Sequence, residues 1–122
     1  MKRILVVDDE PDTSLLLKIV LENHNFKVDS FDDPILALKY FKSNLYDLLI
    51  LDIRMSQMNG IKLYQEIRKI DDKVKVCFLT AGQSYYAAFT DTFCDLKENR
   101  FIQKPIENEE LIERINEIIC SN

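Results

Sequence analysis

Short apolar runs alternate with longer helical patterns along the whole chain, and this alternation constrains the fold more than any other feature. Five runs have the length and residue types of β-strands: 4–7, 26–31, 48–51, 74–79 and 100–103. The first and third are continuously apolar, and the fourth is apolar apart from Lys75; such runs are typical of strands buried on both faces of a parallel sheet. The second alternates instead, as an edge strand covered on one side does.

Helical patterns fill the segments between these runs. They comprise an apolar stripe ahead of His24 (Leu15, Leu16, Ile19 and Val20), a short helix from Ile35 to Phe41, a repeat of Ile61, Tyr64 and Ile67, the segment 84–96, and an amphipathic pattern from Leu111 to Ile119. Five strands alternating with five helices predict an α/β fold of the (βα)5 type, in which the crossovers imply parallel pairing.

Length and composition restrict the chain to one small domain. Its 122 residues include 16 basic and 21 acidic side chains, which give a formal net charge of −5. Nucleic-acid-binding domains need a cationic surface, so we expect no nucleic-acid partner. With only 2 glycines, the collagen-like and glycine-rich linker classes are excluded.

Cysteine spacing and the N-terminal run exclude further classes. Cys77, Cys94 and Cys120 lack metal-ligand spacing and His24 is far from all three in the sequence, so a zinc site is not expected. The apolar run at 4–7 is too short for a signal peptide or a membrane span. We therefore expect a cytoplasmic protein with no membrane partner.

Polar side chains follow four of the predicted strands. Asp8 and Asp9 come after the first run, Asp52 after the third, Thr80 after the fourth and Lys104 after the fifth. In open parallel sheets, ligands bind at the carboxyl ends of the strands. One edge of the predicted sheet thus gathers three carboxylates, a hydroxyl and an ammonium group.

This set of groups is suited to phosphoryl transfer. Asp8, Asp9 and Asp52 repel one another unless a cation lies among them or one is protonated, and Mg²⁺ commonly binds one or two carboxylates and several waters. Lys104 offers a positive charge that suits a carboxylate or a phosphoryl group, and Thr80 offers a hydroxyl donor to a phosphoryl oxygen. An aspartate nucleophile in such a site gives an aspartyl phosphate.

Each of these residues also has a purely structural interpretation. Asp8 and Asp9 are suitable turn residues to cap a first helix that has Pro11 in its first turn, and a lysine such as Lys104 is usually only solvated. All of these residues are predicted at the same ends of the strands, and this coincidence favours a chemical role for the set over separate structural roles.

Four motifs, in this order, closely resemble the receiver domain of two-component response regulators. They are Asp8-Asp9, the segment 51–60 (LDIRMSQMNG), Thr80-Ala81 and Lys104-Pro105. The resemblance covers essentially the whole chain and implies a CheY-like, flavodoxin-like three-layer sandwich with a parallel sheet of order 2-1-3-4-5. It implies a single receiver domain over 1–122, and we expect no output domain.

The resemblance also assigns the central roles. Asp52 is the phosphoacceptor, which receives a phosphoryl group from a histidine kinase or a phosphotransfer protein. Asp8, Asp9 and Asp52 hold Mg²⁺ (or Mn²⁺) together with the backbone carbonyl of Arg54. Such a domain catalyses its own phosphorylation and dephosphorylation, and we expect no turnover of an external substrate.

Further roles follow from the same resemblance. Thr80 and Lys104 contact the phosphoryl oxygens. In the family, movement of the threonine hydroxyl is coupled to rotation of an aromatic residue three positions before the lysine, here Phe101, for which plain core packing is the alternative. Arg54 and Gly82 occupy positions that modulate the dephosphorylation rate in the family; the Arg54 side chain either covers the phosphoryl group or simply points to solvent.

Three features depart from the family pattern. Ser56 stands where proline is usual and Asn59 where aspartate is common, and we expect neither to touch the required chemistry. The Gly-Ala pair usual before the last strand is replaced at 94–100 (CDLKENR), with Asn99 as the best substitute for the glycine. This departure lies near the face from the fourth to the fifth helix, where the family commonly docks an output protein or forms a dimer. We expect an unknown output protein, and a monomer or weak dimer.

Other function classes are disfavoured by particular residues. An aspartate-nucleophile phosphatase needs a second acid two residues after the nucleophile, where this chain has Arg54. A nucleotide-binding flavodoxin-like protein needs a glycine-rich phosphate loop, and no predicted strand is followed by one. A phosphorylation-independent interaction module is disfavoured as well, because such a module has no need for the complete set of Asp8, Asp9, Asp52, Thr80 and Lys104.

Overall fold

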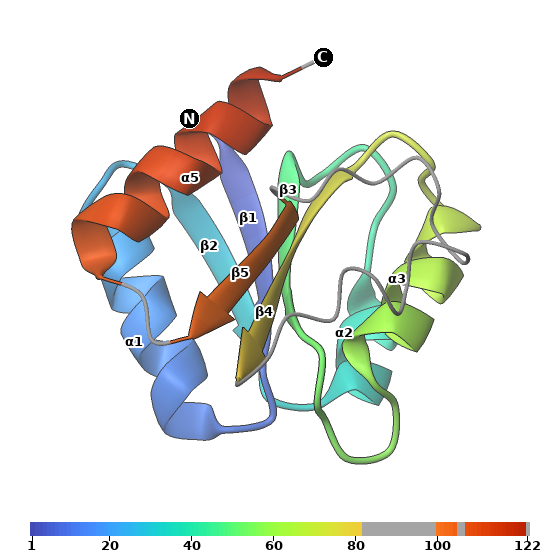
Figure 1. Ribbon diagram of the computed structural model, residues 1–122. Coiled ribbons are helices and arrows are strands. Elements are labelled where there is room, and N and C mark those ends of the chain that lie inside the picture. The colour runs from blue at the N-terminus through green and yellow to red at the C-terminus, as the bar shows by residue number, and fades with distance from the viewer. Residues whose placement is uncertain (82–99, 105–106, 122) are drawn as a thin grey trace.

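Five parallel strands form one sheet in the computed structural model, in the order β2-β1-β3-β4-β5 (Figure 1). The strands are β1 (Arg3–Val7), β2 (Lys27–Phe31), β3 (Leu48–Asp52), β4 (Lys75–Ala81) and β5 (Phe101–Lys104). This order confirms the prediction, with β2 at one edge and β5 at the other. The structure describes residues 1–81, 100–104 and 107–121, so the predicted helix at 84–96, Gly82 and Asn99 lie outside the described residues.

Two layers of helices enclose the sheet. α1 (Pro11–Glu22) and α5 (Asn108–Cys120) cover one face, while α2 (Pro34–Tyr40) and α3 (Gly60–Arg68) cover the other (Figure 1). The predicted three-layer sandwich is therefore confirmed. Among the helices in the described ranges, none combines the length and the apolar character that crossing a bilayer requires.

Alternate residues of each inner strand fill two separate cores. Leu5 and Val7 of β1 face the core under α2 and α3, whereas Ile4 and Val6 face the core under α1 and α5. Successive strand side chains point to opposite faces, and β3 is buried at every position. The continuous apolar runs are thus explained by helices on both faces of the central strands.

α1 packs on the sheet through a different stripe from the one its sequence indicates. Leu15, Leu16 and Ile19 are exposed, at 56%, 59% and 48%, so only Val20 of the predicted stripe reaches the core. The buried residues of this helix are Ser14, Leu17, Val20 and Leu21. Because positions 15–17 and 19–21 are all apolar, the periodicity alone does not select a face.

Side-chain caps start two helices. The Asn59 side chain accepts the backbone N–H of Lys62 at 2.8 Å at the start of α3. Asp33 accepts that of Ile35 at 2.8 Å at the start of α2. Each cap satisfies a backbone donor that the first turn of a helix leaves unpaired, so Asn59 has a structural role next to the predicted site.

Candidate functional site

The three aspartates predicted at the strand ends lie together. Asp8 and Asp9 follow β1, and Asp52 is the last residue of the neighbouring strand β3. One carboxylate oxygen from each lies within 4.8 Å of the other two. Asp8 is 1% exposed and Asp52 is 8% exposed, so two of the three carboxylates have little contact with water.

Lys104 compensates part of this negative charge. Its Nζ lies 3.1 Å from Asp8 Oδ2 and 3.8 Å from Asp52 Oδ1. The strand register brings Lys104 to the same edge as the aspartates, because Asp52 pairs with Leu79 on β4 and Lys104 pairs with Ala81 on that strand. A carboxylate was one of the two partners expected for Lys104, but no spacing in the chain indicates that this carboxylate is Asp8.

The surroundings of Asp52 disfavour its negative charge. Burial and then the charge of Asp8 raise the pKa of Asp52 to about 6, against the opposing effects of Lys104 and of the Arg54 backbone N–H that donates to this carboxylate. A cation among the carboxylates would favour the ionised form again. The charge of the Asp52 carboxylate therefore depends on pH near pH 6 and on any cation bound beside it.

Thr80 and Phe101 are buried on the two strands beyond β3. Thr80 is 2% exposed near the end of β4. The ring of Phe101 stacks on Phe78, with centroids 5.2 Å apart and an angle of 26° between the planes, and it belongs to the core under α2 and α3. Core packing of Phe101 is confirmed, while a switch role for Thr80 and Phe101 stays a prediction.

The loop between β3 and α3 is held against the end of β3. The Gly60 N–H donates to the carbonyl of Ile53 at 2.9 Å. A Cβ on Gly60 would collide with the carbonyl oxygen of Asp52 and would lie 3.2 Å from Ile53 Cα. Glycine is therefore required here by the close approach of two backbones. The side chain of Arg54 in the same loop is exposed.

Ser56 contacts the carboxylate cluster. Its backbone N–H donates to Asp9 Oδ2 at 3.0 Å, and its hydroxyl oxygen lies 3.4 Å from the same atom. The expectation that Ser56 does not touch the required chemistry is therefore wrong. A sequence signal existed for this contact: proline has no N–H, so a serine in its place adds a donor to the loop.

The interpretation of Asp8 and Asp9 as helix caps is wrong. The N-cap residue of α1 is Glu10, whose side chain makes no capping bond, and Pro11 is the first helical residue. Asp8 Oδ1 instead accepts the backbone N–H of Glu10 at 3.0 Å. Its other oxygen, Oδ2, is the one that pairs with Lys104.

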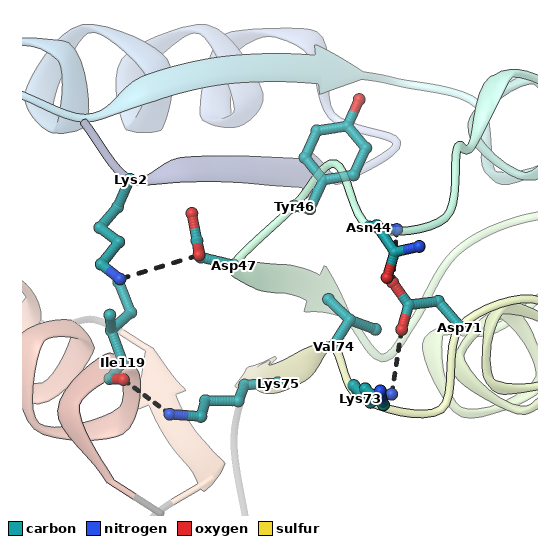
Figure 2. A pocket seen from close by; sticks show the side chains of 9 residues that line it. All are labelled: Lys2, Asn44, Tyr46, Asp47, Asp71, Lys73, Val74, Lys75 and Ile119. Atoms are coloured by element: carbon teal, nitrogen blue, oxygen red, sulfur yellow. Dashed lines mark hydrogen bonds and ion pairs between the residues drawn. The ribbon is translucent and has the colours of Figure 1, made fainter.

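A polar cavity of about 250 Å³ lies at the other end of the strands, away from the carboxylates, where β1, β3 and β4 begin (Figure 2). Asp71 accepts the backbone N–H groups of Asn44 at 2.9 Å and Lys73 at 3.0 Å. Lys75 donates to the carbonyl of Ile119 at 2.6 Å, at the last turn of α5. These charged groups thus contact the loops and the helix end that border the cavity.

Comparisons with known proteins point to one family. The chain matches the family model of the response regulator receiver domain over residues 4–116. It is 32% identical to the transcriptional regulatory protein DltR of Streptococcus agalactiae over 113 residues, which are 93% of this chain and 50% of that protein. It is 31% identical to the response regulator ArlR of Staphylococcus aureus over 119 residues, 98% of this chain and 53% of that protein. The chain thus spans about half the length of the curated relatives it matches.

Solved structures show the same fold. The non-phosphorylated HemR receiver domain of Leptospira biflexa has a TM-score of 0.84 at 27% identity, covering 100% of this chain and 97% of that one. The response regulator protein TrrA of Thermotoga maritima, solved in complex with Mg(2+)-BeF, has a TM-score of 0.75 at 36% identity, covering 97% of this chain and 99% of that one.

Proposed function

The chain belongs to the response regulator receiver domains, and we propose that it is a phosphoacceptor whose reactive group is the carboxylate of Asp52. The observation that supports this most is the meeting of Asp8, Asp9, Asp52 and Lys104 at one edge of the sheet. Its relatives are response regulators and transcriptional regulators, which are signalling proteins and not enzymes that turn over a substrate.

In the proposed reaction, a carboxylate oxygen of Asp52 attacks the phosphorus of a phosphohistidine on a histidine kinase or a phosphotransfer protein. A P–O bond forms to Asp52 while the P–N bond breaks, and the imidazole keeps the electron pair and takes up a proton. Asp52 must be ionised to attack. Because the pKa of Asp52 is raised to about 6, we expect the reaction to slow as the pH falls below about 6 and the carboxylate takes up a proton.

Asp8, Asp9 and Asp52 fit a hard divalent cation such as Mg²⁺ or Mn²⁺. All three offer carboxylate oxygens within 4.8 Å of one another, and Mg²⁺ prefers oxygen ligands. We propose that the backbone carbonyl of Arg54 completes the protein ligands. When bound, the ion neutralises charge on the carboxylates and on the phosphoryl oxygens. The relative TrrA, solved with Mg(2+)-BeF, supports this assignment.

Lys104 and Thr80 are proposed to bind the transferred phosphoryl group. The ammonium group of Lys104 already lies within 3.8 Å of Asp52 Oδ1, and its flexible stem lets it follow a phosphoryl oxygen. Thr80 supplies a hydroxyl donor from β4. We propose that this donation moves Thr80, that Phe101 responds, and that the two states present different protein-binding faces.

Arg54 and Gly82 are proposed to set the lifetime of the aspartyl phosphate. The exposed side chain of Arg54 lies two residues from the acceptor, where it shields the phosphoryl group from water. We expect Arg54→Ala to change the decay rate of the phosphorylated protein. An unchanged decay rate would sink this role for Arg54.

The partners we propose for this chain are proteins: a histidine kinase or phosphotransfer protein as donor, and an output protein of unknown identity. The net charge of −5 supports protein partners over nucleic acid for these 122 residues. DltR is a transcriptional regulatory protein of about twice this length, so we restrict the absence of a nucleic-acid partner to the receiver domain. A monomer or weak dimer and a cytoplasmic location stay predictions.

Phosphorylation by a small donor tests the proposal. With acetyl phosphate and Mg²⁺, we expect a mass gain of one phosphoryl group, located on Asp52 by peptide mapping, and no gain after chelation of the metal. Asp52→Asn is expected to abolish the gain. Asp72→Asn is the matched control, because Asp72 is exposed and outside the cluster, and it should leave the gain unchanged. No gain in the native chain, or a gain that persists in Asp52→Asn, contradicts the proposal.

A further inference from the structure

One hydrogen-bonded contact joins the loop after the acceptor strand to the carboxylate cluster. The backbone N–H of Ser56 donates to Asp9 Oδ2 at 3.0 Å, and the Ser56 hydroxyl lies 3.4 Å from the same oxygen. The two residues are 47 positions apart in the chain. The contact therefore connects the end of β1 directly to the loop between β3 and α3.

Ser56 is itself held in this loop. Its carbonyl accepts the backbone N–H of Met58 at 2.8 Å, and the loop is closed by the bond from Gly60 N–H to the Ile53 carbonyl. Asn59 then caps α3. A donor presented by a loop with these internal bonds has a defined direction, which a freely moving side chain lacks.

The hydrogen bond leaves Asp9 able to bind a metal ion. A carboxylate has two oxygens with about four acceptor positions, so a bond at Oδ2 is compatible with coordination. Asp9 also places an oxygen within 4.8 Å of oxygens from Asp8 and Asp52. Hydrogen bonds to metal-ligating side chains fix their orientation and thereby raise metal affinity.

We propose that Ser56 is a positioning residue, which holds the Asp9 carboxylate toward Asp8 and Asp52 through its backbone N–H. This inference rests on the proposed function, because it takes the cluster to be a Mg²⁺ site. Lys104 pairs with Asp8 and Asp52, and Ser56 provides the partner for the third carboxylate. The same bond couples metal binding to the loop that carries the Arg54 carbonyl.

Calorimetric titration with Mg²⁺ tests the proposal on the full chain. Ser56→Pro removes both the N–H and the hydroxyl, and we expect it to weaken Mg²⁺ binding about tenfold. Ser56→Ala is the matched variant, since it keeps the N–H, and its affinity should stay within about twofold of the native value because the 3.4 Å hydroxyl contact is the weaker one.

The outcomes separate the two proposals. A native chain that binds no Mg²⁺ overturns the metal site and the role of Ser56 together. Native binding with unchanged affinity in Ser56→Pro overturns only the role of Ser56. Tighter Mg²⁺ binding in Ser56→Pro also overturns the role of Ser56, because it would mean that Ser56 competes with the ion for Asp9. A loss of affinity in Ser56→Ala equal to that in Ser56→Pro overturns the assignment to the backbone N–H.

Amide hydrogen exchange of the native chain, followed by NMR, makes the test independent of whether Ser56→Pro folds. We expect the Ser56 amide proton to be protected without Mg²⁺ and to stay protected when the ion is added. Exchange that becomes faster on addition of Mg²⁺ means that the bond to Asp9 breaks, which contradicts a positioning role.

Discussion

Burial beside Asp8 raises the pKa of Asp52 to about 6, whereas an aspartate in an unfolded chain has a value of about 3.9. Between these values the folded state binds more protons than the unfolded state, so stability falls as the pH rises. The contribution of this group is fully present below about pH 4 and is lost by about pH 6. Without a divalent ion, we expect the loss to reach up to about 3 kcal/mol.

Asp52→Asn removes this titration. We expect the variant to show a flatter dependence of unfolding free energy on pH between 4 and 6, and to be about 2 kcal/mol more stable than the native chain at pH 7. Urea unfolding in the presence of EDTA at several pH values measures both effects. Asp72→Asn should keep the native profile, and a native slope in Asp52→Asn would show that another group is responsible.

Gly60 is the second residue at which local geometry makes a sharp prediction. An alanine in place of a helical glycine usually stabilises a protein by about 0.5 to 1 kcal/mol. At Gly60 the added methyl group meets the carbonyl of Asp52, so we expect Gly60→Ala to destabilise the fold by about 1 to 3 kcal/mol. Urea unfolding gives the sign, and stabilisation would show that α3 does not approach β3 this closely.

At the scale of elements, α1 offers a matched pair of leucines. Leu17 is 9% exposed and its neighbour Leu16 is 59% exposed. We expect Leu17→Ala to cost about 2 to 4 kcal/mol of unfolding free energy and Leu16→Ala less than about 0.5 kcal/mol. Urea unfolding of both variants measures the difference. A larger loss in Leu16→Ala than in Leu17→Ala would mean that α1 packs through the stripe predicted from the sequence.

The elements also show why the sequence predicted some features and not others. β3 could be predicted because burial on both faces leaves a continuous apolar run. The meeting of Asp8 and Asp52 could be predicted because the carboxyl ends of parallel strands lie side by side. The face of α1 that packs on the sheet could not be predicted, because apolar residues surround most of that helix. The bond from Ser56 to Asp9 depends on the path of a loop, which local periodicity does not record.

At the scale of the whole molecule, the candidate site depends on the two cores together. Alternating side chains of the inner strands anchor each strand to both helix layers, so the residues at the strand ends have little freedom to move apart. The three carboxylates therefore cannot reduce their mutual repulsion by moving apart. The cation expected to relieve that repulsion should then stabilise the molecule as a whole.

Mg²⁺ is accordingly expected to raise the thermal midpoint, with a stabilisation of about 2.7 kcal/mol when its concentration is 100 times the dissociation constant. The effect should depend on pH, because only the ionised carboxylate of Asp52 is a ligand and its pKa is about 6. We expect a large shift at pH 7.5 and a much smaller one at pH 4.5, measured by thermal unfolding with Mg²⁺ and with EDTA. Asp72→Asn should behave like the native chain, whereas equal shifts at both pH values would show that the ion does not bind at Asp52.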